Sequence, residues 1–112
     1  MASPAPSLSI GIEEEYMLVD PATRELISSP DPAFLTACKE ALGSNASREL
    51  LQAQVEVGTS VCPDIAAARA ELVRLRGTVG RIARQHGMAI IAASTHPTAR
   101  WTAQQSSEEE RY

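Results

Sequence analysis

Apolar residues at strand and helix spacings divide this chain into short elements. The run from Ser9 to Val19 predicts a first strand, and the stretch Glu25 to Ser28 predicts a short return strand after the turn Asp20-Pro21-Ala22-Thr23. From Glu49 to Gly58, apolar and polar side chains alternate, which predicts a half-buried strand. The continuous apolar run from Met88 to Ser94 predicts a buried central strand.

Two amphipathic helices are predicted between these strands. Asp31-Pro32 provides a cap and a first turn for one helix, and Gly43 ends it before a polar turn at residues 44–47. Cys62-Pro63-Asp64 opens a longer helix that ends at Gly87. Its apolar stripe consists of Ile65, Ala68, Leu72, Leu75, Val79 and Ile82. The predicted order is therefore hairpin, helix, strand, helix, strand.

The polar side of the longer helix is rich in arginine. Such a charge run is usually a solvated face, and we prefer this interpretation to a phosphate-binding surface. The arginines are Arg69, Arg74, Arg76, Arg81 and Arg84. Gly77 and Gly80 weaken the helix, and we expect them to allow close packing on the sheet.

Size and charge narrow the functional classes. With 112 residues the chain is one small domain or a piece of a larger one, and a net charge of -4 argues against nucleic-acid binding. Cys38 and Cys62 do not suggest a disulfide scaffold, residues 1–7 do not resemble a signal peptide, and no apolar run could span a membrane. We expect a cytoplasmic protein with a disordered leader at 1–7, a folded part at 8–103 and an exposed polar tail at 104–112.

Candidate chemistry lies in the first strand. Glu13 and Glu15 share one face, about 7 Å apart, whereas Glu14 points to the other face. The pair repels unless a cation, a basic partner or water lies over it. Glu56 belongs to the polar stripe of a later strand, which could equally be the wet face of an antiparallel sheet. His96, after the last strand, is either a ligand-binding residue or a hydrogen-bonded loop histidine.

Three separated blocks resemble a known family. They are Gly11-Ile12-Glu13-Glu14-Glu15-Tyr16, then Val55-Glu56-Val57-Gly58-Thr59 with Val61-Cys62-Pro63-Asp64, and Thr95-His96-Pro97 ahead of Trp101. Their order and spacing resemble the N-terminal part of the carboxylate-amine ligases, or type 2 glutamate-cysteine ligases. The resemblance implies an α+β fold, the N-terminal portion of a glutamine-synthetase-like catalytic domain, with a mainly antiparallel sheet and helices on one face.

The resemblance also implies a reaction and a site. The enzyme would use Mg²⁺ with ATP to join an amino acid such as glutamate to an amine such as cysteine through an acyl phosphate, as in glutathione-type thiol biosynthesis. Glu13, Glu15 and Glu56 would be metal ligands, with Glu49 a weaker candidate, and His96 would be a weak candidate for substrate binding. Magnesium takes oxygen ligands and neutralises charge on a transferred phosphoryl group.

Family members are much longer, so we expect a chain that is inactive alone. One alternative is a non-catalytic α+β interaction module or pseudoenzyme fragment that binds a partner, or a second copy, through an open sheet edge. Another is assembly with a separately encoded remainder. Neither alternative involves nucleic acid or a membrane.

Overall fold

The fold is built from one sheet and two helices. The structure is a computed structural model that describes residues 5–49, 51–93 and 95–107. The elements in chain order are β1 (Glu13–Val19), α1 (Pro32–Leu42), a 3-10 turn (Gly43–Asn45), β2 (Ala46–Arg48), β3 (Gln54–Gly58), α2 (Ile65–Gln85), β4 (Ala89–Ile91) and a second 3-10 turn (Trp101–Ala103).

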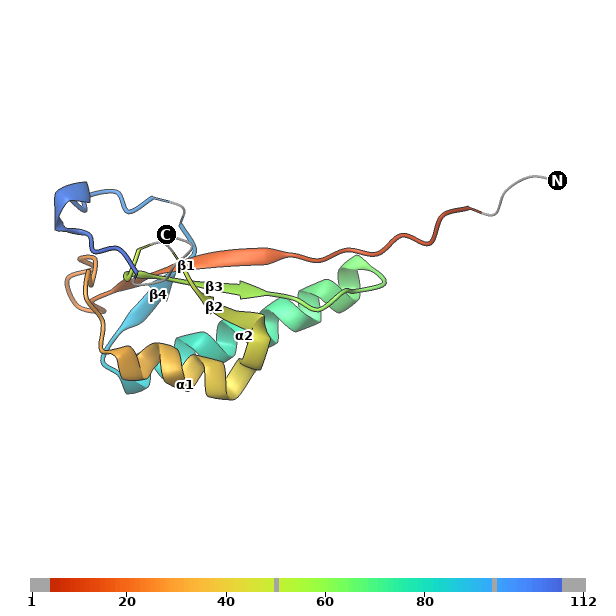
Figure 1. Ribbon diagram of the computed structural model, residues 1–112, viewed down its shortest axis with the longest axis horizontal. Helices are drawn as coiled ribbons and strands as arrows, with labels where there is room; N and C mark the ends of the chain where they lie inside the picture. The colour runs from red at the N-terminus through yellow and green to blue at the C-terminus, as the bar shows by residue number, and fades with distance from the viewer. Residues whose placement is uncertain (1–4, 50, 94, 108–112) are drawn as a thin grey trace.

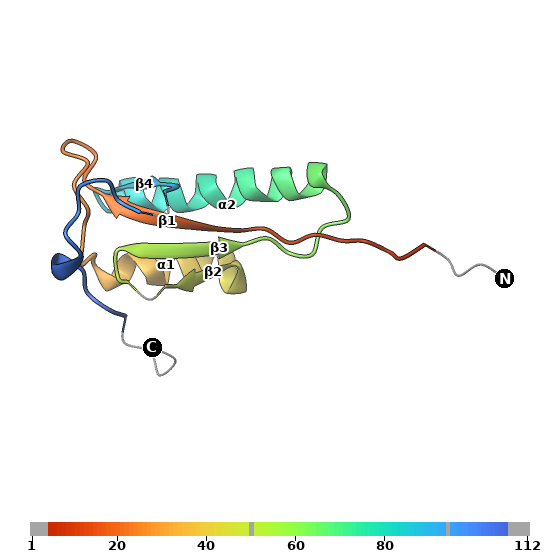
Figure 2. The same ribbon diagram turned by 90° about the horizontal axis from the view of Figure 1, so that it is seen from above.

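All the strand pairings are antiparallel. The strands lie in the order β2-β3-β1-β4, so β1 and β3 occupy the middle of the described sheet. Both helices cover the same face, and the segment after β4 passes around the end of the sheet at which β1 finishes (Figures 1 and 2). The predicted α+β class, with helices on one face of an antiparallel sheet, is confirmed.

The core fills the space between the sheet and the helices. Tyr16 and Leu18 from β1 are fully buried there, and they meet side chains from both helices and from β3. Burial of this apolar surface is the main favourable term that holds α1 and α2 on the sheet. The opposite face of β1 is therefore free of any helix within the described residues.

Both helices begin and end where the sequence predicts. Asp31 accepts a hydrogen bond from the Ala33 amide at 2.9 Å, and Asp64 accepts one from the Ala67 amide at 2.8 Å. Gly43 and Gly87 follow the two helices with φ of 57° and 73°, a backbone conformation that favours glycine.

The strand predicted from Glu49 to Gly58 is wrong in its first half. The turn predicted at residues 44–47 is correct for residues 44–45, which lie in the 3-10 turn, and wrong for residues 46–47, which belong to β2. Ala46–Arg48 forms β2, and the chain then reverses so that β3 starts only at Gln54. The alternation does hold in β3, where Val55 and Val57 are buried. Of the described residues between these strands, 51–53 continue the apolar and polar alternation of β3 but lie in the connection, because a short β2 needs them to turn back.

The other strand predictions also need correction. β4 is shorter than predicted and lies at the edge of the described sheet, half-buried rather than central; Ser94 falls outside the described residues. The return strand after β1 is reduced to a single bridge between Val19 and Leu26. A continuous apolar run cannot distinguish an edge strand that packs on a helix from a central strand.

Two details of α2 differ from expectation. Ile65, predicted on the buried stripe, is 69% exposed, whereas Ala68, one turn later on the same stripe, is fully buried. Gly77 packs against nothing: a Cβ built there has no neighbour within 4 Å. At Gly80 a Cβ would make ordinary contact with Ile90, so close packing is not the reason for either glycine.

The polar segment after β4 is anchored in its described part. The Gln52 amide donates to the Gln105 carbonyl at 2.8 Å, and Ser107 is only 6% exposed. Residues 1–4 of the predicted leader and 108–112 of the predicted tail lie outside the described residues. Among the residues described, neither helix is long and apolar enough to cross a membrane.

Candidate functional site

Pairing between β1 and β3 brings two glutamates face to face. Glu15 lies directly opposite Glu56 in the antiparallel register. Directly opposite residues project to the same side of a sheet with their Cβ atoms about 5 Å apart. Tyr16 and Val55, the neighbours of these glutamates along each strand, point into the core, so both carboxylates lie on the face away from the helices. We call this the open face.

The reversal between β2 and β3 adds a third carboxylate. Ser47 lies opposite Glu56, and Glu49 follows Ser47 by two residues, which gives it the same facing. Carboxylate oxygens of Glu15, Glu49 and Glu56 all lie within 4.8 Å of one another. We call these three residues the carboxylate cluster.

Crowding of acids changes the ionisation of Glu56. A hydrogen bond shared with Glu49 is the largest cause, followed by desolvation and by repulsion from Glu49, Glu13 and Glu15, and together they raise the pKa of Glu56 to about 7. Glu56 therefore holds a proton at acidic pH. A divalent cation would remove the repulsion by replacing that proton.

Glu13 flanks the cluster and is not part of the group of three. It pairs with Gly58 on β3, and its Cγ lies 3.6 Å from where a Cβ on Gly58 would be. Its charge nevertheless contributes to the raised pKa of Glu56. Of the four predicted ligands, the structure thus brings three together and leaves Glu13 beside them.

Glu14 occupies the opposite face, as predicted. Its carboxylate accepts hydrogen bonds from the Tyr16 hydroxyl at 2.7 Å and from Arg76 Nε at 3.3 Å, and it also pairs with the Arg76 Nη2. Burial pushes the pKa of Glu14 upward, but the contacts with Arg76 and Tyr16 outweigh it and the pKa is lowered. Burial and the same carboxylate raise the pKa of Tyr16 to about 12.

His96 is held by backbone groups at both ring nitrogens. Its Nδ1 accepts from the amides of Thr98 at 3.1 Å and Ala99 at 3.0 Å, so Nε2 carries the proton and donates to the Arg24 carbonyl at 2.8 Å. This is the geometry of a hydrogen-bonded loop histidine. It also supports Arg24, whose φ is 63°.

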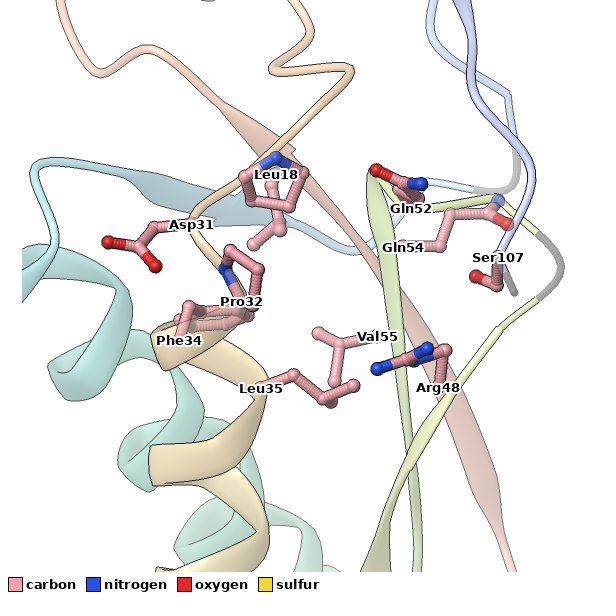
Figure 3. A pocket seen from close by; sticks show the side chains of 11 residues that line it. Leu18, Asp31, Pro32, Phe34, Leu35, Arg48, Gln52, Gln54, Val55 and Ser107 are labelled. Carbon is pink, nitrogen blue, oxygen red and sulfur yellow. The ribbon is translucent and has the colours of Figure 1, made fainter. Parts of the chain in front are cut away.

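A separate pocket lies on the helix side of the sheet. It has a volume of about 280 Å³ and combines an apolar wall, with Phe34 and Leu35 from α1, with polar groups of Arg48, Gln54 and Ser107 (Figure 3). None of the three cluster glutamates lines it. The pocket and the carboxylate cluster are therefore different features of the described chain.

Sequence analysis gave Glu49 only as a weaker candidate ligand, and it did not identify Ser107 as a residue of the site. In one continuous strand, Glu49 and Glu56 would be seven residues apart and face opposite sides, whereas the chain reversal puts them on one face. The Ser107 hydroxyl donates a hydrogen bond to the Glu49 carbonyl, a contact between residues 58 positions apart. No local pattern in the sequence carries a signal for such a contact.

Comparison with known proteins gives a consistent result. A model of glutamate-cysteine ligase family 2 matches residues 9–112. A protein of Jannaschia sp. (strain CCS1), named "Putative glutamate--cysteine ligase 2", is 50% identical over 104 residues, which cover 93% of this chain and 27% of the relative. A protein of the same name from Roseiflexus castenholzii is 50% identical over 111 residues, which cover 99% of this chain and 29% of the relative. The chain thus spans less than a third of the length of these curated relatives.

Proposed function

This chain belongs to glutamate-cysteine ligase family 2, and from that premise we propose that it supplies the carboxylate ligands of a Mg²⁺-ATP site in a carboxylate-amine ligase. The proposed reaction joins glutamate to the amine of cysteine, the substrates in the name of its relatives. ATP would phosphorylate the glutamate side chain, and the amine would then displace phosphate to form the amide. ADP and phosphate are the other products.

The observation that carries this proposal is the meeting of Glu15, Glu49 and Glu56 on the open face. Their donors are carboxylate oxygens, which Mg²⁺ prefers to nitrogen or sulfur. The raised pKa of Glu56 is caused first by its hydrogen bond with Glu49, and then by desolvation and repulsion from the neighbouring acids. A divalent cation would relieve this crowding of carboxylates. The donor set therefore fits a hard divalent cation.

The three residues have different mechanical roles in the proposed site. Glu15 and Glu56 are fixed by their own strand pairing, so they would hold the cation at a defined place on the sheet. Glu49 would close the site from the β2–β3 connection, and Glu13 would extend the negative surface beside it. The bound Mg²⁺ would neutralise phosphate charge on ATP during phosphoryl transfer.

A substrate-binding role for His96, and a cytoplasmic location, stay predictions.

Nucleotide turnover tests the proposal directly. Because this chain spans less than a third of its relatives' length, ADP release is measured with this sequence in place of the matching N-terminal part of a full-length relative. The assay contains Mg²⁺, ATP, glutamate and cysteine, and is repeated with each amino acid left out. We expect release that needs both amino acids and falls at least 100-fold in Glu15→Gln, because one ligand loses its charge. The control is Glu40→Gln, an exposed position on α1. Equal release by Glu15→Gln and the parent protein would contradict the proposal.

A second candidate role is association through a sheet edge. β2 and β4 are the outer strands of the described sheet, and an outer strand offers backbone groups for pairing with another chain. Sedimentation over a hundredfold range of protein concentration distinguishes the roles. A mass that rises with concentration supports association, and a constant monomer mass contradicts it.

A further inference from the structure

Glu49 differs from the other two cluster glutamates in how it is held. Glu15 and Glu56 lie within β1 and β3, and they pair with each other across the ladder. Glu49 follows the last residue of β2, Arg48, and belongs to the connection that leads to β3. The strand ladder therefore fixes two carboxylates, and something else must fix the third.

The segment Gln104–Ser107 forms hydrogen bonds with the β2–β3 connection and so holds it in place. Gln52 donates from its backbone amide to the Gln105 carbonyl at 2.8 Å and from Nε2 to the Ser106 carbonyl at 3.0 Å. Leu51 forms an isolated antiparallel bridge with Ser106. Ser107 completes the series with its hydroxyl, which donates to the carbonyl of Glu49 itself.

The Ser107 side of this contact is buried. Ser107 is 6% exposed, and it is one of two polar residues among the buried side chains described, whereas Glu49 is partly exposed. Loss of the hydrogen bond would leave the buried Ser107 hydroxyl without this partner, which is costly. The hydrogen bond therefore resists movement of the Glu49 backbone.

The backbones of Glu49 and Glu56 are held differently. Glu56 cannot move without breaking the ladder with β1, whereas Glu49 lies in the β2–β3 connection, outside both strands. The Ser107 hydrogen bond restrains the Glu49 backbone at that point.

We propose that Ser107 is a positioning residue for the cation site, holding the Glu49 backbone so that its carboxylate meets Glu15 and Glu56. This inference rests on the proposed function, because it concerns the same carboxylate cluster. Partners that orient a ligand commonly change metal affinity by tenfold or more when removed. Coupling is also reciprocal: a cation that draws Glu49 inward must stabilise the docking of Gln104–Ser107.

Cation affinity of Ser107 variants tests the proposal. Mg²⁺ binding to the protein is measured by titration calorimetry for the parent, Ser107→Ala and Ser107→Thr. We expect about tenfold weaker binding in Ser107→Ala, and parent-like binding in Ser107→Thr, which keeps the hydroxyl. The control is Thr102→Ala, an exposed hydroxyl in the same part of the chain. Circular dichroism of each variant confirms that the fold is kept.

A double-mutant cycle separates positioning from general loosening. In a Glu49→Gln background the Ser107→Ala change should have little further effect on Mg²⁺ affinity, because the ligand that Ser107 positions has lost its charge. Additive losses would overturn the proposal. Hydrogen exchange at residues 104–107 gives a second readout: Mg²⁺ should slow it in the parent and not in Glu49→Gln, and no change in the parent would also overturn the proposal.

The two proposals fail in different ways. If Glu15→Gln binds Mg²⁺ as tightly as the parent, the cation site of the proposed function is wrong, and the Ser107 inference is overturned with it. If Glu15→Gln weakens binding while Ser107→Ala leaves it unchanged, the site is retained and only the role of Ser107 is overturned.

Discussion

The two faces of β1 treat neighbouring glutamates in opposite ways. On the helix side, Glu14 is paired with Arg76 and the Tyr16 hydroxyl, and its pKa is lowered. On the open face, Glu15 meets further acids, and the pKa of Glu56 opposite it is raised to about 7. The same residue type at adjacent positions thus belongs to an ion pair on one face and to a cluster of carboxylates on the other.

This difference follows from what each face is packed against. α2 packs on the helix side of the sheet and carries exposed arginines, and Arg76 is placed so that its side chain reaches Glu14 on β1. The open face receives side chains from β3 and from the β2–β3 connection, and both contribute acids there. A fold that needed only stability would have little reason to gather three carboxylates, since like charges directly opposite in a sheet are destabilising.

Cation binding is expected to show the largest difference between the faces. Glu56→Gln should bind Mg²⁺ about 100-fold more weakly than the parent, because a charged ligand becomes a neutral one at the centre of the cluster. Glu14→Gln should bind Mg²⁺ like the parent, since its carboxylate points toward the helices. Titration calorimetry of both variants makes the comparison, and equal losses in the two would remove the functional distinction between the faces.

Loss of the ion pair between Arg76 and Glu14 should lower stability and leave Mg²⁺ affinity unchanged. Arg76→Ala leaves the half-buried Glu14 without its cationic partner, and we expect it to lower the free energy of unfolding by about 1.5 kcal/mol in urea titrations, the pair being partly exposed. In Glu14→Gln the same arginine change should cost less. A fall in Mg²⁺ affinity with unchanged stability would be the wrong pattern for a structural pair.

Stability of the cation-free protein should depend on pH with a different sign for each face. The pKa of Glu56 is raised from 4.5 to about 7, so between these values the folded state keeps a proton that the unfolded chain has released. Stability therefore falls as pH rises from 4.5 to 7, by about 1 kcal/mol once solvent screening is allowed for. Glu14, with its lowered pKa, contributes stability above pH 4.5 that is lost as pH falls through its pKa.

Urea titrations from about pH 2 to pH 8 without divalent cation measure both slopes. Glu56→Gln should abolish the fall between pH 4.5 and pH 7 and leave the acid-side loss in place. Glu14→Gln should do the reverse. If Glu56→Gln keeps the full fall in stability, the raised pKa arises elsewhere on the molecule.

The sequence was sufficient for much of this contrast but not for all of it. Alternation along β1 correctly separates Glu14 from Glu15, and caps at Asp31 and Asp64 correctly locate both helices. The contribution of Glu49 depends on a chain reversal that the continuing apolar alternation between Glu49 and Gly58 conceals. Periodicity in the sequence shows which side chains share a face within one strand. After a chain reversal, the face on which a side chain lies depends on where the turn occurs.

The sequence also does not predict contacts between residues that are far apart along the chain. Arg76 reaches Glu14 across 62 positions, and Ser107 reaches Glu49 across 58. The sequence predicts a solvated face for the arginines of α2, and it does not distinguish Arg76, which pairs with Glu14, from the others. Only the packing angle of α2 on the sheet selects Arg76 from its neighbours, and a helical stripe does not specify that angle.

The smallest expected effect concerns the helix that delivers Arg76. Gly77 is exposed in α2 with open space at its Cβ position, so alanine fits there without strain. Gly77→Ala should raise the free energy of unfolding by about 0.8 kcal/mol through helix propensity alone. Because the change acts on the helix side, Mg²⁺ affinity on the open face should stay at the parent value in the same calorimetric titration. A gain in stability accompanied by altered Mg²⁺ affinity would mean that α2 mechanically couples the two faces of β1. Glu14 and Glu15 would then differ in their electrostatic surroundings, but a change on one face would still affect the other.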